Sequence, residues 1–368
     1  MDDKNKVLLV TLEGTSNFGN RLQHYALQHT IESLGFTIDN LMVRDHQSLI
    51  EVKFKNSIKY FLSRCGLKKY LNGLSQGRRA VKLINFNKRF LTNMLRMRSD
   101  EVFRRNWSEY SFAVTGSDQV WHNWHSKYIP DELRFYYLEF IEVQKRVSYA
   151  PSFGFTAFPE EDLTAHQRGL NEMYALSCRE KEGCELIRAL TGREAQKVLD
   201  PTLLLTAEKW SQIEKEPDFK VPDHYLLKLF LGNVIPEYHA EINQIAQELE
   251  LQILDIGNKD NPGYYDISPD EFIWLVHHAD FVCTDSFHTT VFAILFERNL
   301  RVFRRKAEKF EDMFGRLHDL LKPLGLMSVV YGEGERRSTV LDREAQKYLS
   351  VERERSLQYL RDSLKINK

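Results

Sequence analysis

The residues of this sequence best suited to chemistry are Ser286, His288 and Thr289, which follow the short apolar run Phe281-Val282-Cys283. Such a run is typical of a buried strand, and the apolar spacing from Phe287 onward predicts a buried helix. A helix start presents unpaired N–H groups and a partial positive charge, which suit an anionic ligand. A histidine in that first turn titrates near neutral pH and can transfer a proton. The alternative for His288 is packing in a strand–helix corner.

Two asparagines follow the first predicted strand, Val7–Thr11. Asn17 and Asn20 lie in a loop rich in glycine and capping residues, just before a predicted helix that ends near Gly35. Their amides suit hydrogen bonds to a neutral polyol or sugar. The alternative is turn formation and helix capping. The glycines of this loop do not form the GxGxxG pattern of a dinucleotide site.

A second polar group follows the apolar run Phe112–Val114. Gly116 allows a ligand or another backbone to approach closely. Asp118 and Gln119 come just past the strand's C-terminal end, where open α/β sheets bind their ligands. Asp118 therefore suits a hydrogen bond from a sugar hydroxyl or the role of a base, and the alternative is a turn aspartate that caps a helix.

Arginines stand at two further strand ends. Arg179 follows the short strand Ala175–Cys178, and its guanidinium suits recognition of a carboxylate or phosphate. The alternative for Arg179 is a surface ion pair with Glu180 or Glu182. The second group is the cluster Arg304-Arg305-Lys306, which follows a predicted strand at 301–303.

Composition bounds the class of protein. The chain has 368 residues with 42% hydrophobic and 28% charged residues and a net charge of -1, which is ordinary for a soluble protein and argues against nucleic acid as a partner. Four cysteines without CxxC spacing indicate reduced thiols in the cytoplasm rather than disulfides or a zinc site, so we expect no metal and no cofactor. The first residues do not predict a signal peptide, and no stretch is long enough to span a membrane.

The pattern of strands and helices predicts an α/β fold with two Rossmann-like, doubly wound domains facing a cleft. We expect an N-terminal domain at 1–158, a C-terminal domain at 159–335 and a terminal helix at 336–368 that packs back. Further strands are expected at 136–140, 146–150 and 198–205, the last interrupted by a turn at Asp200-Pro201.

Residues 52–99 form a basic segment with thirteen lysines and arginines and no acid. Apolar residues are interleaved, so parts of the segment predict basic amphipathic helices. Such helices can lie on anionic membrane surfaces, which would make the protein peripheral at the membrane. The alternative is a solvated helical insertion that packs through its apolar stripe.

Six separated motifs, taken in order, resemble the polysaccharide pyruvyl transferase family. The match covers roughly residues 5 to 330 and rests on Asn17-Phe18-Gly19-Asn20-Arg21-Leu22-Gln23, Thr115-Gly116-Ser117-Asp118-Gln119-Val120-Trp121, Ser148-Tyr149-Ala150-Pro151-Ser152-Phe153-Gly154, Ser177-Cys178-Arg179-Glu180-Lys181, Val198-Leu199-Asp200-Pro201-Thr202 and Thr284-Asp285-Ser286-Phe287-His288-Thr289-Thr290.

The resemblance implies a fold like that of GT-B glycosyltransferases and an activity as a pyruvyl transferase. Such an enzyme transfers the enolpyruvyl group of phosphoenolpyruvate to a sugar, forms a cyclic ketal and releases phosphate. The implied products are the acidic glycans of capsules, exopolysaccharides or cell walls. A lipid-linked acceptor would give the basic segment 52–99 a membrane role.

The resemblance also implies roles for the residues singled out above. His288 is the expected acid, and Asp118 is the second catalytic candidate. Donor binding is expected on the C-terminal side, and acceptor binding on the N-terminal side. The donor candidates are Arg179, Ser286, Thr289, Arg304 and Arg305, and the acceptor candidates are Asn17, Asn20 and Gln119.

One position departs from the family pattern. Better-known pyruvyl transferases carry arginine two positions before the histidine, where this sequence has Ser286. Serine cannot supply that charge, and Arg304, Arg305 or Lys306 are the candidate replacements. Two other functions compete: a glycosyltransferase that uses a nucleotide-sugar, with Asp255 or Glu297 facing the ribose, and a non-catalytic glycan-binding protein of the same fold.

Overall fold

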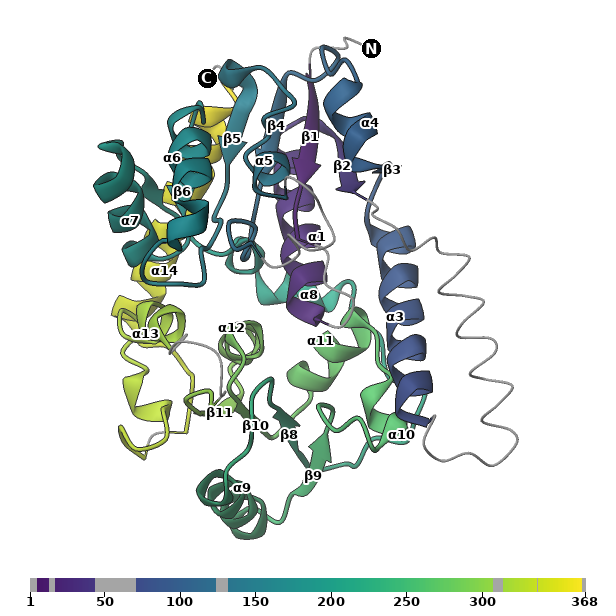
Figure 1. The fold of residues 1–368 in the computed structure, drawn as a ribbon. Helices are drawn as coiled ribbons and strands as arrows, with labels where there is room; N and C mark the ends of the chain where they lie inside the picture. Colours follow the sequence, from purple (N-terminus) through teal and green to yellow (C-terminus); the bar gives the residue numbers. More distant parts are fainter. Residues whose placement is uncertain are drawn as a thin grey trace.

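The computed structural model describes residues 5–12, 17–43, 71–123, 132–306, 314–335 and 337–365. Two parallel sheets lie at opposite ends of the molecule with helices between and around them (Figure 1). The predicted α/β fold with two Rossmann-like sheets is confirmed.

The first sheet has five parallel strands in the order β3-β2-β1-β4-β5, which is the 3-2-1-4-5 order of a Rossmann sheet. The strands are β1 (Lys6–Val10), β2 (Thr37–Val43), β3 (Met94–Met97), β4 (Phe112–Thr115) and β5 (Arg146–Ser148). In β1 the residues Val7–Val10 are buried on both faces, which explains their continuous apolar run. Helix α1 (Phe18–Ser33) connects β1 to β2, and α4 (Ser99–Arg104) connects β3 to β4.

Residues beyond position 158 pack beside this first sheet and include a separate two-stranded parallel sheet. They form α6 (Leu163–Asn171), β6 (Ser177–Cys178), α7 (Lys181–Thr191) and β7 (Gln196–Lys197). Ala175 forms a parallel bridge with Val147 of β5, and the Ser177 hydroxyl donates to the Ser148 carbonyl over 2.8 Å. The C-terminal domain was expected at 159–335, whereas these contacts show that residues up to about 198 pack with the first sheet. A helix followed by a two-residue strand has the same sequence pattern whichever sheet it joins.

The second sheet has four parallel strands in the order β11-β10-β8-β9. They are β8 (Tyr225–Leu229), β9 (Gln252–Asp255), β10 (Phe281–Thr284) and β11 (Asn299–Val302). The associated helices are α8 (Ala207–Ser211), α9 (Pro236–Glu248), α10 (Pro262–Tyr265), α11 (Pro269–His277), α12 (Phe287–Leu295) and α13 (Gly315–Leu321). The strand, sharp turn and buried helix predicted at 281–296 are all present. The helix lies in the core because it is apolar on most sides.

Two expected strands are absent from their positions. Residues 136–140 end the short helix α5 (Glu132–Tyr136) and continue as a turn in which Leu138 has a φ of 57°. Tyr137 stacks on Trp121 at 5.3 Å between ring centroids, so burial of a turn accounts for this apolar run. Residues Pro201–Leu203 form a 3-10 turn, which Asp200 caps by accepting a hydrogen bond from the Thr202 amide.

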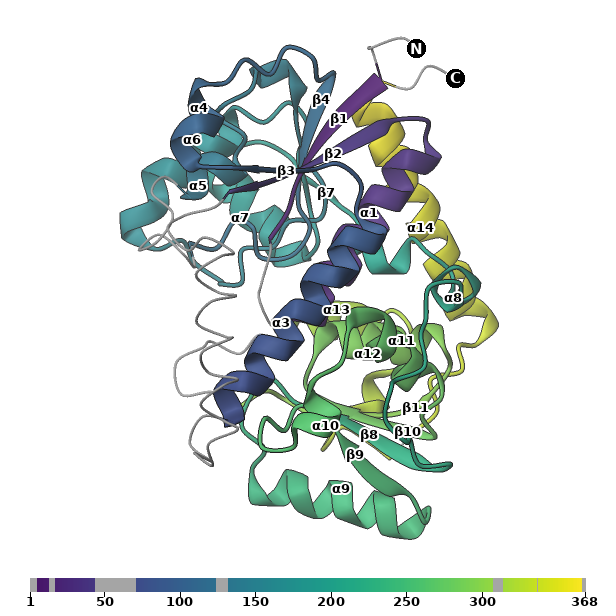
Figure 2. The same ribbon diagram turned by 90° about the vertical axis from the view of Figure 1, so that its right-hand side faces the viewer.

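The terminal helix α14 (Arg343–Ser363) packs back across both halves, as the sequence predicts (Figure 2). Its first half contributes Leu349 to the core of the second sheet. In its second half, the Tyr359 hydroxyl donates to the Ser148 carbonyl over 2.8 Å, and Leu360 joins the core of the first sheet.

Helix α3 (Leu71–Phe90) also crosses between the halves (Figure 2). Lys82 pairs with Glu271 of α11 at 2.7 Å, and Arg89 lies 3.4 Å from Asp270. Arg79 stacks its guanidinium between the Phe18 and Tyr265 rings, at 4.0 and 4.3 Å from their centroids. These bases of the basic segment therefore contact the second half of the protein.

The membrane contact predicted for residues 52–99 stays a prediction, since residues 52–70 lie outside the described part of the chain. Within the described part, no helix is both long and apolar enough to cross a membrane.

Candidate active site

The site residues gather where the strand order of each sheet reverses. In the first sheet this point lies between β1 and β4, and in the second between β8 and β10. Ligands of open α/β sheets bind outside the strand ends at such points. Helix α12 and the start of α1 lie in the region between the two sheets (Figure 1). The sequence-predicted groups at the ends of β4 and β10 therefore come from opposite sides of one interface.

Asp118 is the centre of the N-terminal side. It follows β4 with a φ of 65°, an uncommon backbone conformation for a residue other than glycine. The Asn20 amide, from the first turn of α1, donates to the Asp118 Oδ2 atom. Gly116 allows the chain to reach this position, because a Cβ there would lie 2.1 Å from the Tyr149 carbonyl oxygen. The predicted close approach at Gly116 is thus made by another backbone segment.

Arg179 is surrounded by acids. Its Nε donates to Glu180 over 2.8 Å, one Nη donates to Asp200 over 2.8 Å, and the other Nη lies 3.5 Å from Asp118. Burial opposes the guanidinium charge, but the carboxylates of Glu180, Asp200 and Asp118 outweigh it and raise the pKa of Arg179. The arginine therefore holds carboxylates of three strand ends together, and an anion from solution would compete with them.

Asp200 is the functional residue that sequence reasoning missed on this side. Its Oδ2 atom faces Arg179 at 2.8 Å and the His288 Nε2 atom at 3.5 Å. Burial alone would raise the pKa of Asp200, but His288 and Arg179 lower it well below the usual range, so the carboxylate stays charged. The signal available in the sequence was the Asp200-Pro201-Thr202 motif, which contributes to the family resemblance and which we otherwise interpreted as a turn.

His288 lies in the first turn of α12 and is 7% exposed. One edge of its ring faces Asp200, and the Nδ1 edge packs against Gly19 at the start of α1. A Cβ on Gly19 would lie only 2.1 Å from the His288 Nδ1 atom. The imidazole thus contacts both sides of the interface, with the Asp200 carboxylate near its Nε2 atom and Gly19 against its Nδ1 edge.

Ser286 and Thr289 have local roles at the same helix start. Ser286 is the N-cap of α12, and its hydroxyl accepts a hydrogen bond from the Thr289 amide over 3.4 Å. The Thr289 hydroxyl is buried, and among the described residues it has no hydrogen-bond partner. Asp285, the preceding residue, accepts hydrogen bonds from the backbone amides of Leu231 and Gly232, just past the end of β8.

The cluster at 304–306 is paired with acids. Arg305 donates to the Asp285 carboxylate over 3.2 Å and to the Asp285 carbonyl over 3.1 Å. Arg304 donates to Glu333 over 3.0 Å, and its guanidinium lies 3.9 Å from the centroid of the Phe314 ring. Arg305 therefore borders the start of α12, whereas Arg304 is directed toward other groups.

The two remaining acceptor candidates make local contacts. The Asn17 side chain accepts a hydrogen bond from the Gly19 amide over 2.9 Å, which is the helix-capping alternative. Gln119 is 9% exposed and packs its amide against Gly154, where a Cβ would lie 2.1 Å from the Gln119 nitrogen. Of the three acceptor candidates, Asn20 is the one joined directly to Asp118.

Arg316, in the first turn of α13, is a second residue that sequence reasoning missed. It lines a cavity of about 110 Å³ together with Phe155, Glu180 and Glu182, and it also lines the smaller cavity beside Arg179 and Asp200. Burial, reinforced by the nearby positive charge of Arg179, lowers the pKa of Arg316 to about 10. The guanidinium remains charged at neutral pH. No motif in the sequence marks Arg316.

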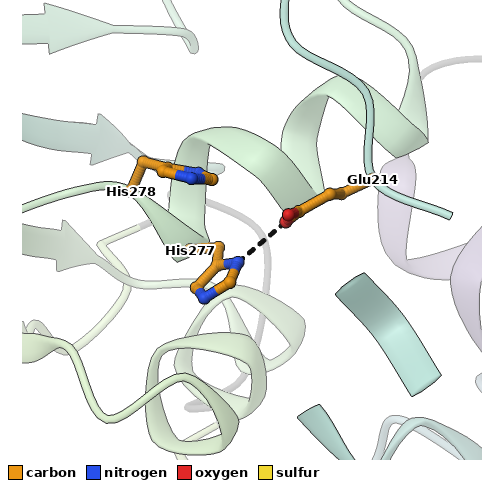
Figure 3. Close-up of side chains that lie close together, drawn as sticks. All are labelled: Glu214, His277 and His278. Atoms are coloured by element: carbon orange, nitrogen blue, oxygen red, sulfur yellow. Dashed lines mark hydrogen bonds and ion pairs between the residues drawn. The ribbon is translucent and has the colours of Figure 1, made fainter. Parts of the chain in front are cut away.

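A separate group of possible metal ligands lies at the end of α11. Glu214, His277 and His278 offer one ligand atom each, all within 4.8 Å of one another (Figure 3). His277 pairs with Glu214 at 2.8 Å and stacks on Phe296, while His278 donates to the Trp274 carbonyl over 2.9 Å. These contacts involve the Nδ1 atom of each imidazole, and the group shares none of the residues described above around His288.

Comparisons of sequence and of structure relate the chain to known proteins. The sequence profile of the polysaccharide pyruvyl transferase family matches residues 17–306. A search of curated protein sequences finds no match. Similar solved structures include S. aureus MnaA with UDP, at 9% identity over 99% of this chain and 98% of that chain with a TM-score of 0.49. Another is UDP-GlcNAc 2-epimerase from Methanocaldococcus jannaschii, at 10% identity over 94% of this chain and 99% of that chain with a TM-score of 0.45. A third is E. coli ADP-heptose lps heptosyltransferase II, at 13% identity over 96% of this chain and 98% of that chain with a TM-score of 0.34. At identities this low, the likeness concerns the fold alone.

Proposed function

Because the chain belongs to the polysaccharide pyruvyl transferase family, it is a transferase, and we propose that its donor is phosphoenolpyruvate. The acceptor is a sugar of a surface polysaccharide or of its lipid-linked precursor, and the product is a pyruvate ketal. The observation that carries the proposal is the His288–Asp200 pair at the interface of the two halves, within the residues that the family profile matches.

The reaction requires a proton donor, and His288 fits that role. Protonation of the terminal CH₂ carbon of phosphoenolpyruvate gives an oxocarbenium-like centre at the neighbouring carbon. Asp200 faces the acid before the transfer, since its carboxylate lies 3.5 Å from the His288 Nε2 atom and remains charged. Arg179 acts through Asp200 as a positioning residue.

Two sugar hydroxyls complete the ketal. The first attacks the oxocarbenium centre and loses its proton, the carbon–oxygen bond to phosphate then breaks, and the second hydroxyl attacks in the same way. Of the two hydroxyl protons, one balances the proton delivered to carbon and the other leaves with phosphate. We assign proton acceptance to Asp118, which Asn20 orients by its hydrogen bond. Gln119 and the loop at Asn17 border the acceptor.

The donor lies on the C-terminal side in this proposal. The start of α12 offers helix N–H groups and the Thr289 hydroxyl to its phosphate or carboxylate. Arg305 adds positive charge beside Asp285. Ser286 supports this surface as the N-cap of the helix rather than as a charge.

The test is to incubate the full chain with phosphoenolpyruvate and a panel of synthetic and lipid-linked glycans. We expect phosphate release that depends on the glycan, together with a mass gain on the glycan equal to a pyruvate ketal. A parallel panel of nucleotide-sugars serves as the comparison. Turnover of a nucleotide-sugar without any release from phosphoenolpyruvate would replace the proposal by a glycosyltransferase activity, and no turnover in either panel would favour a glycan-binding protein.

A further inference from the structure

Three neighbouring cavities of the described structure meet at one side chain. The largest, about 110 Å³, is bounded by Phe155, Glu182 and Arg316 among others. The second, about 40 Å³, lies beside Asp200 and also contacts Arg316. The third, about 10 Å³, lies beside Asp285 and is again bordered by Arg316. Arg316 is the residue common to all three, so a ligand in any of these spaces would lie beside it.

The other cations around His288 are directed to specific acids. Arg179 faces three carboxylates, and Arg305 faces the carboxylate and carbonyl of Asp285. Arg304 pairs with Glu333 and stacks on an aromatic ring. A donor anion that bound any of these arginines would have to compete with an acid of the protein, and the same holds for Arg316, which borders two of the cavities together with Glu180.

Charges of both signs surround Arg316. Burial and the positive charges of Arg179 and Arg305 oppose its own charge, whereas Glu180 and Asp118 favour it, and the net effect lowers the pKa of Arg316. A bound anion offsets both opposing effects. A guanidinium in partly desolvated surroundings also binds carboxylate or phosphate in two parallel hydrogen bonds.

Helix α13 holds Arg316 at the interface of the halves. Asp319, in the same helix, accepts a hydrogen bond from the Lys181 amide of α7 over 3.1 Å. The buried residues Leu317 and Leu321 of α13 join the core of the second sheet. The helix is therefore anchored on both sides, and the position of Arg316 follows from the fold.

We propose that Arg316 binds the anionic group of the donor, in place of the arginine that the family pattern expects at position 286. The inference rests on the proposed function for the identity of the donor, phosphoenolpyruvate. It assigns the missing charge to α13 rather than to α12 or to the cluster at 304–306. Ser286 is then free to cap α12.

The experiment measures anion binding separately from turnover. Isothermal titration of the full chain with phosphoenolpyruvate, and with inorganic phosphate, gives a Kd for wild type, Arg316→Gln and Arg316→Lys. We expect Arg316→Gln to weaken phosphoenolpyruvate binding by about 10- to 100-fold, the loss of charge-assisted hydrogen bonds. Arg316→Lys keeps the charge but loses the planar guanidinium that can form two parallel hydrogen bonds, so we expect phosphoenolpyruvate to bind several-fold more weakly. In turnover, the KM for phosphoenolpyruvate should rise while the KM for the glycan stays unchanged.

The matched control is Lys322→Gln, which removes a positive charge at the exposed end of α13 and outside the three cavities. Its Kd should equal that of wild type. If Arg316→Gln does not fold, the Lys variant decides, and an unchanged Kd in that variant overturns the inference. So does an unchanged Kd in a folded Gln variant, or a wild type that binds neither ligand. A wild type that binds both ligands but turns over no phosphoenolpyruvate contradicts the proposed function alone.

Discussion

On the N-terminal side of the site, Asp118, Arg179 and Asp200 are held by one another and by Asn20, whereas on the C-terminal side Arg316 stands at the meeting point of three cavities. The first group is nearly excluded from water, with Arg179 and Asp118 each 5% exposed. A network of this kind is costly to disturb and is fixed before any ligand binds. The difference is between a fixed electrostatic network on the N-terminal side and an arginine of the C-terminal side that borders cavities lined by residues of both sides.

The two sides differ because of the elements that build them. Asp118, Arg179 and Asp200 follow the parallel strands β4, β6 and β7 of one sheet region, so their carboxyl ends converge. Arg316 comes from a helix that lies outside its sheet. His288, at the start of α12, faces Asp200 of the first group and packs against Gly19 of α1.

The largest effect is expected from Arg179→Gln. This change leaves three acids without the buried cation that faces them, which costs about 3–5 kcal/mol when one partner of a buried ion pair is removed. Urea unfolding measures the loss. The control is Arg188→Gln, because Arg188 and Glu194 form a pair whose side chains are 70% and 75% exposed and should contribute little. Equal unfolding midpoints for both variants would mean that the N-terminal network is not a stabilising unit.

The next effect is expected from His288→Gln. Loss of a positioned general acid lowers kcat by about 10²- to 10⁴-fold. The fold should survive, because the substitution retains a polar side chain of similar volume at the interface. Phosphate release measures kcat, and thermal unfolding measures the fold. A kcat within twofold of wild type would mean that His288 is not the proton donor and that it does not link the two sides of the site.

The sequence predicted much of this architecture because local patterns determine it. The apolar run at Phe281–Cys283 and the helical spacing from Phe287 lead directly to β10 and α12. The placement of His288 at a helix start followed from the same pattern. The roles assigned to the site residues remain predictions, since no measurement of activity bears on them.

Other features depend on contacts between distant segments. Asp200 looks like a turn residue in the sequence, and only folding brings its carboxylate to Arg179 and His288. Arg316 has no local signal at all, because its importance comes from the cavities around it. The helix α6 and strand β6 join the first sheet through the Ser148–Ser177 contacts, which hydrophobic spacing does not report.

The smallest effect is expected from Gly19→Ala, which changes the contact between the two sides by one methyl group. The backbone of α1 accepts alanine, and the substitution favours the helix by up to about 1 kcal/mol. However, the new Cβ would lie 2.1 Å from the His288 Nδ1 atom, and α1 cannot move away easily because Phe18 stacks on Phe272 at 5.0 Å. The imidazole must shift instead. A displacement of about 1 Å in a reacting group costs up to about 10²-fold in rate, so we expect kcat to fall by about 10- to 100-fold without loss of thermal stability. The control is Gly263→Ala in α10, where the nearest atom to a new Cβ is the Asn261 side chain at 3.4 Å, and its kcat should equal that of wild type. If Gly19→Ala also retains wild-type kcat, the contact between the start of α1 and His288 does not position the acid, and the N-terminal side acts on His288 through Asp200 alone.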